Sequence, residues 1–391
     1  MSADVAWLMS ADAVRERAHA LLAVAERGEL AHFAVRLERL DEAADLVTEV
    51  TRATYPDLDV PYHSRWRHFV VGGEDRWAAL AARLDVDADE VARIRFDLAV
   101  TSVLLDAGAG ERWRYRDALG GTELARSEGL AIASFDLFRA GAFSADPRQP
   151  WRADAGALAG VGVADLARGF QVTEDNPLVG LEGRAALLRR LGEALGPGGR
   201  VGDLYDELKR RAVDGALPAP AILAAVLRGL GPIWPGRIEL DGVNLGDVWR
   251  HPVGGLVPFH KLSQWLSYSL VEPLEEAGIR VTGLDRLTGL PEYRNGGLLV
   301  DTGVLVPKDQ RILADALEVG DPAVVEWRAL TVALLDRVAA AVRARLGVPA
   351  DAFPLAKVLQ GGTWTAGRVI ARRLRADGGP PIRIRSDGTV F

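Results

Sequence analysis

The sequence contains no cysteine among its 391 residues, and only four of its 47 basic side chains are lysines. Without thiols the chain has no disulfides, no thiolate nucleophile, no iron–sulfur ligands and no cysteine-containing zinc site. A chain of this length buries enough apolar surface to fold without such cross-links. We therefore expect a globular protein stabilised by its own core.

Long apolar runs and an excess of positive charge are also missing. The longest apolar run, Leu98–Leu105, falls well short of the roughly 20 residues that span a bilayer, and the N-terminus lacks the basic region of a secretory signal. The net charge of -7 argues against broad binding to nucleic acid or to an anionic membrane. We expect a cytoplasmic protein that binds neither nucleic acid nor membranes, and its oligomeric state stays open.

The common catalytic motifs are absent as well. No lysine follows a glycine, which excludes a P-loop, and the chain has no H-E-x-x-H, no G-x-S-x-G and no G-x-G-x-x-G between a strand and a helix. The six histidines form no pair four residues apart that faces a carboxylate. We therefore expect no metal and no organic cofactor. The chemistry that remains, from carboxylates, an amine and arginines, suits hydrolysis or glycosyl transfer better than redox reactions.

Apolar residues recur three and four positions apart through most of the chain, which predicts a mainly α, multi-helix fold with a few short β-hairpins. We expect one large helical catalytic unit over 1–391, with lobes 1–195 and 200–391 joined by the flexible stretch 196–199. Hairpins are expected at Arg237–Leu245 and Ile382–Phe391. Helices are expected at Ala11–Ala25, Leu40–Thr54, Arg76–Leu84, Ala88–Leu105, Gly129–Ala140, Val179–Ala194, Val201–Ala212, Pro220–Leu230, Pro258–Ala277 and Ala323–Leu346.

One short segment, PYHSRWRHF at Pro61–Phe69, interleaves basic and aromatic side chains. Planar cations beside aromatic rings are suited to binding a phosphate or carboxylate next to a sugar or base. The alternative is a structural cluster of ion pairs anchored by a tryptophan. The candidate ligand-binding residues are His63, Arg65, Trp66, Arg67 and His68.

A second candidate segment is the predicted helix that begins at Pro258. It places Lys261 in the first turn, where the helix dipole disfavours a cation, and this suggests a functional reason for the lysine. Gln264 lies on the same side of the helix, one turn later, and His260 precedes the lysine, and we expect both residues to bind the substrate. A solvated surface lysine is the alternative.

Three further carboxylates are candidates because of their surroundings. Glu292 follows a proline and precedes Tyr293, Arg294 and an Asn-Gly-Gly sequence, so we expect it on a turn that approaches a ligand closely, unless the turn is an ordinary surface turn. Asp106 ends the longest apolar run, where a carboxyl group is expected to have a raised pKa, although helix capping explains its neighbours equally well. Glu174 precedes a helix together with Asp175, which is the expected N-cap. We expect Glu174, Tyr293 and Arg294 to contact the substrate.

These segments resemble the uracil-catabolism family of fungi and bacteria, the type named Urc-four or Urg-three. The resemblance includes HSRWRHF, TSVLLDAGAG, FQVTEDNPLVGLEGR, VPFHKLSQWL, LTGLPEYRNGGLLVD and the terminal SDGTVF, and it extends over nearly the whole chain. It implies a role in a pathway that opens the pyrimidine ring of a uracil nucleotide and leaves a ribosylurea-type compound to be broken down.

The chain is also similar, more distantly, to the queuosine-salvage nucleotide N-glycosylases, whose helical architecture is similar to that of DNA glycosylases. Their F-Y-K-R-A-Q segment resembles residues 259–264, and their L-T-M-F-A-D-Y-R segment resembles residues 287–294. The active-site lysine and aspartate of those enzymes correspond in this match to Lys261 and Glu292. The resemblance thus implies a helical N-glycosylase fold and a catalytic pair in which a glutamate replaces the aspartate.

Together these observations predict a hydrolase that cleaves the N-ribosidic bond of ribosylurea, or of its 5′-phosphate, to urea and ribose or ribose phosphate. Glu292 would stabilise the oxocarbenium-like ribose and activate water, Lys261 would hold the ribose or polarise the urea carbonyl, and Asp106 would be a second carboxylate. The alternatives are an amidohydrolase that attacks the ureido carbonyl and a non-catalytic scaffold that binds pathway intermediates.

Overall fold

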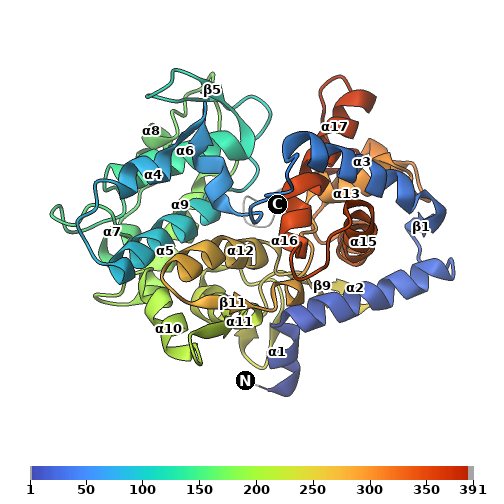
Figure 1. Ribbon diagram of the computed structural model, residues 1–391, viewed down its shortest axis with the longest axis horizontal. Coiled ribbons are helices and arrows are strands. Elements are labelled where there is room, and N and C mark those ends of the chain that lie inside the picture. Colours follow the sequence, from blue (N-terminus) through green and yellow to red (C-terminus); the bar gives the residue numbers. More distant parts are fainter. Residues whose placement is uncertain (1, 386–391) are drawn as a thin grey trace. The chain divides into compact units, whose positions relative to one another are not determined.

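The protein is described here by a computed structural model of residues 2–385, which are mainly α-helical, as the apolar periodicity predicted (Figure 1). The chain folds into two compact units. Unit 1 contains residues 2–63, Arg237–Gln264 and Gly283–Arg385, and unit 2 contains Ser64–Gly236 and Trp265–Thr282. The glycine- and proline-rich stretch 196–199 lies inside unit 2, so the division between the units falls at other points of the chain than this stretch suggested.

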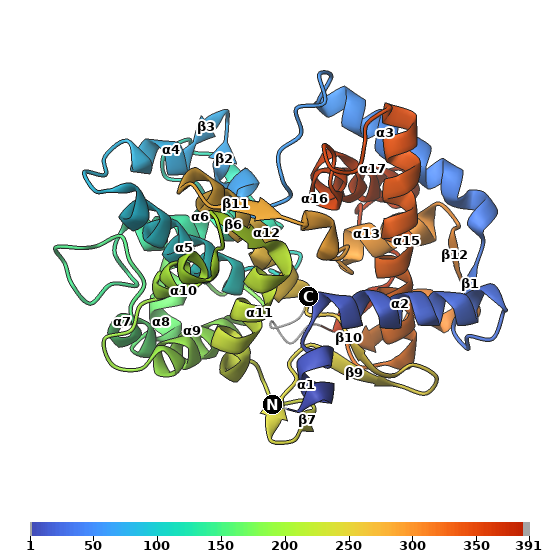
Figure 2. The ribbon, with the colours of Figure 1, turned by 60° about the horizontal axis from the view of Figure 1, so that its bottom comes forward.

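Unit 1 is built around α15 (Pro322–Leu346), which has buried residues on all of its sides. The helix begins where the Asp321 carboxylate accepts a hydrogen bond of 2.8 Å from the Ala323 amide, and it ends at Gly347, whose φ of 72° favours glycine. Two amphipathic helices, α2 (Ala11–Glu26) and α3 (Leu40–Thr54), pack against it (Figures 1 and 2). α15 is therefore the central helix of unit 1.

The helix α13 (Tyr293–Asp301) packs closely against two neighbours through glycines. A Cβ atom at Gly296 would lie 2.6 Å from the Trp327 ring of α15, and one at Gly367 of α17 (Trp364–Leu374) would collide with the carbonyl of Arg294. Gly296 on α13 and Gly367 on α17 therefore serve close helix packing. The predicted turn at this point is wrong, because residues 293–301 continue as a helix.

Short strands complete unit 1. The predicted hairpin at Arg237–Leu245 is confirmed as β7 paired with β8. In the predicted C-terminal hairpin, β14 pairs in parallel with β13 instead, and residues 386–391, which include its turn, lie outside the described residues. β1 pairs antiparallel with β12, and β9 with β10. The remaining elements of unit 1 are α1 (Ala3–Leu8), β1 (Phe33–Val35), η1 (Leu37–Arg39), β7 (Glu239–Leu240), β8 (Val243–Asn244), β9 (Val248–His251), β10 (Gly255–Pro258), η4 (Leu284–Arg286), β12 (Leu305–Pro307), α14 (Arg311–Ala314), β13 (Ala316–Glu318), α16 (Leu355–Val358), the π-helical turn η5 (Leu359–Thr363) and β14 (Arg383–Arg385).

Unit 2 has α5 (Ala88–Leu104) at its centre. The Asp87 carboxylate caps this helix by accepting a hydrogen bond of 2.8 Å from the Glu90 amide, and nearly every residue from Ile94 onward is buried. α5 packs against α6 (Arg126–Arg139), α9 (Leu181–Leu195) and α10 (Asp203–Arg211). The apolar run seen in the sequence thus forms the core of unit 2.

The other elements of unit 2 are short apart from two helices. They are η2 (Arg65–Phe69), β2 (Val70–Val71), β3 (Glu74–Asp75), α4 (Arg76–Ala81), β4 (Tyr115–Arg116), β5 (Glu123–Leu124), α7 (Ala155–Ala159), α8 (Val163–Gly169), β6 (Ala216–Pro218), α11 (Ala219–Leu230), η3 (Gly231–Ile233) and β11 (Arg280–Thr282), together with most of α12 (Lys261–Glu276). The strands β6 and β11 pair in parallel.

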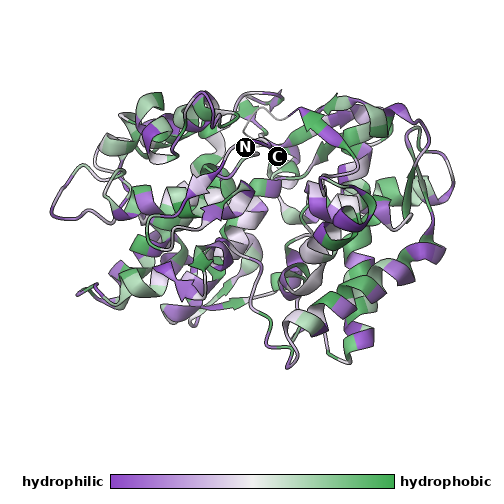
Figure 3. Cartoon of the chain, turned by 90° about the horizontal axis from the view of Figure 1, so that it is seen from above, coloured by the Kyte–Doolittle hydropathy of each residue, from purple (hydrophilic) through white to green (hydrophobic). Residues whose placement is uncertain are grey.

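All ten helices predicted from periodicity are present, with ends within three residues of those expected. Most helices in Figure 3 carry both hydrophobic and hydrophilic residues, which is the amphipathic pattern that the prediction used. Of the described helices, none combines the length and the apolar character needed to span a lipid bilayer.

Candidate active site

Glu292 is the N-cap of α13. Its Oε2 accepts a hydrogen bond of 2.8 Å from the Arg294 amide, and its Oε1 accepts one of 2.5 Å from the Asn295 amide. The residue is 8% exposed, and this burial raises the pKa of its carboxyl group even though the two amides and the positive charge of Lys261 act in the opposite direction. A buried carboxylate with raised basicity is suited to taking a proton from water.

Lys261 lies in the first turn of α12, as predicted. It is the first residue of this helix, which begins three residues later than expected. Pro258 belongs to β10, where it pairs with Val248, and does not start the helix. The positive charge of Lys261 lowers the pKa of both Glu292 and His63. The lysine is half-buried. It lies close enough to Glu292 and His63 within unit 1 for its charge to affect the pKa of each.

His63 is held in its neutral form by its surroundings in unit 1. Burial lowers its pKa to about 4, and Lys261 adds to this effect. Its Nδ1–H donates to Gln360 Oε1 at 3.0 Å, and Gln360 Nε2 donates to the Tyr55 hydroxyl at 3.2 Å. Gln360 lies in the π-helical turn η5, a feature that often marks functional sites. Because the proton of the neutral ring is on Nδ1, its lone pair is on Nε2, and this nitrogen can accept a hydrogen bond.

Gln264 and Thr288 form a reciprocal hydrogen-bonded pair, called here the amide clamp. Gln264 Nε2 donates to Thr288 Oγ1 at 2.5 Å, while the Thr288 amide donates to Gln264 Oε1 at 3.0 Å, and both residues are fully buried. The clamp joins the first turn of α12, which carries Lys261, to the segment that leads to Glu292. Gln264, a predicted ligand-binding residue, thus connects two parts of the protein interior.

The remaining predicted residues of unit 1 also have contacts within the fold. His260 is 2% exposed, and its Nε2–H donates to the Leu8 carbonyl at 2.8 Å. Arg294 Nη1 donates to the Gly378 carbonyl at 2.9 Å, and its guanidinium lies 5.0 Å from the centre of the half-buried Tyr293 ring.

Asp106 and Arg65 form a buried ion pair in unit 2. Arg65 Nη1 lies 2.8 Å from Asp106 Oδ2, and Arg65 Nε donates to Ser102 Oγ at 2.7 Å. Arg65 is fully buried, and Asp106 comes directly after the C-cap of α5 at Leu105. The Asp106 carboxylate is therefore matched by a guanidinium.

The basic and aromatic segment is divided between the units, because His63 belongs to unit 1 and its other candidates belong to unit 2. Trp66 is buried, with Nε1 donating to a backbone carbonyl at 2.7 Å. Arg67 lies 2.6 Å from Glu272, and the His68 ring packs edge-on against Trp265. With Arg65 on Asp106 and Arg67 on Glu272, these contacts are those expected of the structural alternative, an ion-pair cluster with a tryptophan anchor.

Glu174 and Asp175 are exposed in unit 2. The predicted N-cap role of Asp175 is wrong, because α9 begins at Leu181 with Gly180 as its N-cap. Among the described residues no cluster of three or more metal-binding side chains occurs.

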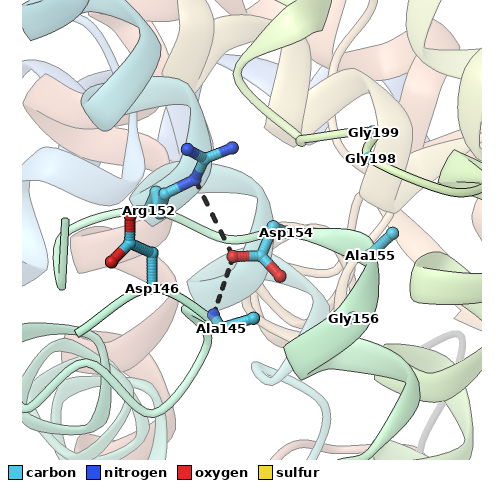
Figure 4. A pocket seen from close by; sticks show the side chains of 8 residues that line it. All are labelled: Ala145, Asp146, Arg152, Asp154, Ala155, Gly156, Gly198 and Gly199. Carbon is cyan, nitrogen blue, oxygen red and sulfur yellow. Dashed lines mark hydrogen bonds and ion pairs between the residues drawn. The ribbon is translucent and has the colours of Figure 1, made fainter. Parts of the chain in front are cut away.

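A pocket of about 340 Å³ lies in unit 2 (Figure 4). Its carboxylates have local partners, since Asp154 caps α7 and also accepts from the Ala145 amide at 2.8 Å, while Asp146 pairs with Arg148. None of the residues predicted to form the site lines it. The full lining is Ala145, Asp146, Arg152, Asp154, Ala155, Gly156, Gly198 and Gly199.

Several residues that shape the site were missed from the sequence. Gln360, Thr288, Asp247 and Arg328 occupy ordinary sequence contexts, and their partners lie far away along the chain. Lys261, by contrast, gave a local signal, because it lies in the first turn of a predicted helix, where a cation is unfavourable.

Comparison with known proteins identifies the family. Residues 7–391 match the family described as "Protein of unknown function (DUF1688)". Protein urg3 of Schizosaccharomyces pombe is 41% identical over 402 residues, and Uracil catabolism protein 4 of Lachancea kluyveri is 37% identical over 436 residues, with 99% of both chains covered in each case. The chain belongs to this family, and the resemblance to the uracil-catabolism family is confirmed.

The lowered pKa of His63 makes a prediction about stability. Between pH 4 and pH 6.5 the unfolded chain binds a proton at this residue and the folded chain does not, so stability falls as the pH falls through this range. We expect wild type to lose roughly 2 kcal/mol more than His63→Asn between pH 7 and pH 5, in urea unfolding at both pH values. Equal losses in the two proteins would contradict a buried, neutral His63.

A second prediction concerns the amide clamp. Thr288→Val keeps the shape of the side chain but leaves the buried Gln264 amide without its acceptor, so the free energy of unfolding should fall by about 1–3 kcal/mol. The control is Thr331→Val, because the buried Thr331 hydroxyl donates only to the Trp327 carbonyl one turn earlier in α15. Denaturant unfolding of both variants measures this difference. If both variants lose a similar, small amount of unfolding free energy, the clamp has no special role in stability.

Proposed function

We propose that this protein is a hydrolase of uracil degradation that cleaves the N-ribosidic bond of ribosylurea or of its 5′-phosphate. The pathway is suggested by the name of the relative Uracil catabolism protein 4 and by the resemblance described above. The observation that carries the reaction is the buried Glu292 carboxylate, fixed by two backbone amides and lying in the field of Lys261.

The proposed reaction needs few groups. The bond between ribose C1 and the urea nitrogen breaks, its electron pair leaves with nitrogen, and the ribose develops oxocarbenium character. The negative charge of Glu292 stabilises this positive charge, and Glu292 takes the proton of the water that attacks C1. Lys261 hydrogen-bonds to the urea carbonyl, which makes the urea a better leaving group, or to the ribose, which holds the sugar in place. The departing urea nitrogen takes up the proton that Glu292 removes from the water, so that neutral urea is released and the carboxylate is restored. The products are urea and ribose, or ribose 5-phosphate.

Two features of the site favour this chemistry. The raised pKa of Glu292 makes it a stronger base than an ordinary glutamate once it is ionised. The two amides that hold it are fixed by the start of α13, so the carboxylate needs no reorganisation during the reaction. Asp106 belongs to unit 2 and is paired there with Arg65, so the proposed reaction is built on Glu292 and Lys261 alone.

The first functional prediction is that Glu292→Gln lowers turnover of ribosylurea or its 5′-phosphate by at least about 100-fold, because it removes the charge that stabilises the transition state. Glu292→Asp keeps the charge and should retain more activity. Steady-state urea release by the purified variants measures both effects.

The matched control is Asp321→Asn, which removes the charge of another N-cap carboxylate in unit 1, at the start of α15. Both substitutions alter a helix cap, so thermal unfolding should change in both while turnover falls only for Glu292→Gln. If Glu292→Gln turns over like wild type, or loses activity only in proportion to its folded fraction, Glu292 has no part in the reaction.

The second functional prediction is the pH dependence of kcat/KM. Because the reaction requires ionised Glu292, the rate falls as the pH falls through the pKa of this group. Burial raises that pKa above the ordinary value of 4.5, so the acid limb should lie above pH 4.5. A profile that stays flat to pH 4.5 in a folded enzyme would argue against this assignment.

A further inference from the structure

Lys261 lies at the start of a helix, where a cation is unfavourable, and the carboxylate of Asp247 supplies negative charge there. The free amides of the first turn of a helix attract negative charge and repel a lysine. Asp247 Oδ2 accepts a hydrogen bond of 3.0 Å from the Lys261 amide and so supplies negative charge at the start of α12. The lysine is therefore accompanied by a charged cap that lies 14 residues earlier in the chain.

Asp247 is itself held rigidly. Arg328 Nη1 donates to Asp247 Oδ1 and Arg328 Nη2 donates to Oδ2, both at 2.8 Å, and Trp249 Nε1 donates to Oδ1 at 2.7 Å. Burial would raise the pKa of Asp247, but the charge and hydrogen bonds of Arg328 outweigh it and leave the pKa well below its ordinary value. The pair is thus ionised, and its planar two-point contact fixes the direction of the carboxylate.

The turn that leads into Lys261 is fixed by the same pair. The carbonyl of Asp247 accepts a hydrogen bond of 2.9 Å from the Phe259 amide, and the Arg328 guanidinium lies 4.0 Å from the centre of the Phe259 ring. His260 has a φ of 48°, in the left-handed region that side chains rarely adopt, and its ring is tied to the Leu8 carbonyl. The backbone before Lys261 is therefore held in one conformation from several directions.

We infer that Asp247, locked by Arg328, is a positioning residue that sets the direction in which Lys261 enters the active site. The pair holds the lysine's own amide, the turn before it and the charge balance of its helix end, while Arg328 belongs to the central helix α15. The catalytic importance of this role rests on the proposed function, but the placement of Lys261 can be measured without any turnover.

The test uses the small number of lysines. Reductive methylation with ¹³C-formaldehyde keeps the charge of each amine and labels only Lys209, Lys261, Lys308, Lys357 and the N-terminus of the full chain. Loss of one signal in Lys261→Arg assigns the Lys261 resonance. Asp247→Asn should move or broaden that resonance while the other lysine signals stay in place.

In Asp247→Asn we also expect kcat to fall by about 10- to 100-fold, with a smaller change in KM. This is the range for a reacting group displaced by about 1 Å. The matched control is Asp285→Asn, since Asp285 also pairs with an arginine, Arg343, and accepts a backbone amide, that of Leu355, at 2.5 Å. It should lower stability without moving the Lys261 signal or kcat.

Arg328→Lys is a second variant, which can be used if Asp247→Asn does not fold. It keeps the positive charge but loses the two-point contact with Asp247. We expect it to shift the Lys261 signal in the same direction as Asp247→Asn. An unchanged Lys261 signal in a folded Asp247→Asn or Arg328→Lys protein would overturn the inference. A shifted signal in a protein whose wild type does not hydrolyse ribosylurea would uphold the positioning role and reject only the proposed function.

Discussion

The amide clamp between Gln264 and Thr288 is the interaction on which the candidate site depends most. It joins two chain segments that each carry one of the groups proposed to take part in the reaction, Lys261 on one side and Glu292 on the other. Because both polar ends are fully buried, separating them would leave an amide without a partner in the interior. The segments that carry the lysine and the glutamate are therefore linked by a contact that is fully buried.

The ion pair of Asp247 and Arg328 complements the clamp at the other end of the same helical turn. The clamp fixes where the start of α12 lies, and the ion pair fixes how the chain enters it, through the left-handed His260. Both act on a lysine in a chain that otherwise uses arginine almost throughout. An arginine would bring a wide planar fork to this position, whereas the ammonium of lysine is compact and forms hydrogen bonds in several directions.

The sequence predicted the helices well, and Leu40–Thr54 was predicted with the same bounds as α3, because amphipathic periodicity is a local property. It also selected Lys261 and Glu292, but gave the wrong local structure for Glu292: Asn-Gly-Gly suggests a turn, whereas Gly296 is small in order to accommodate the Trp327 ring. His63 and Arg65 are neighbours in sequence but belong to different units, so their shared role in one cluster was an inference from adjacency. The pairing of His63 with Gln360, 297 residues away, has no local signal at all.

The identity of the products is the sharpest test of whether this protein hydrolyses an N-ribosidic bond, the reaction proposed for Glu292 and Lys261. Purified protein is incubated with ribosylurea and, separately, with its 5′-phosphate, and urea, ammonia and reducing sugar are measured together. We expect equal amounts of urea and ribose, or ribose phosphate, with no ammonia. Release of ammonia and carbon dioxide would show that the ureido carbonyl is attacked instead, and the absence of turnover with both compounds would contradict the proposed reaction.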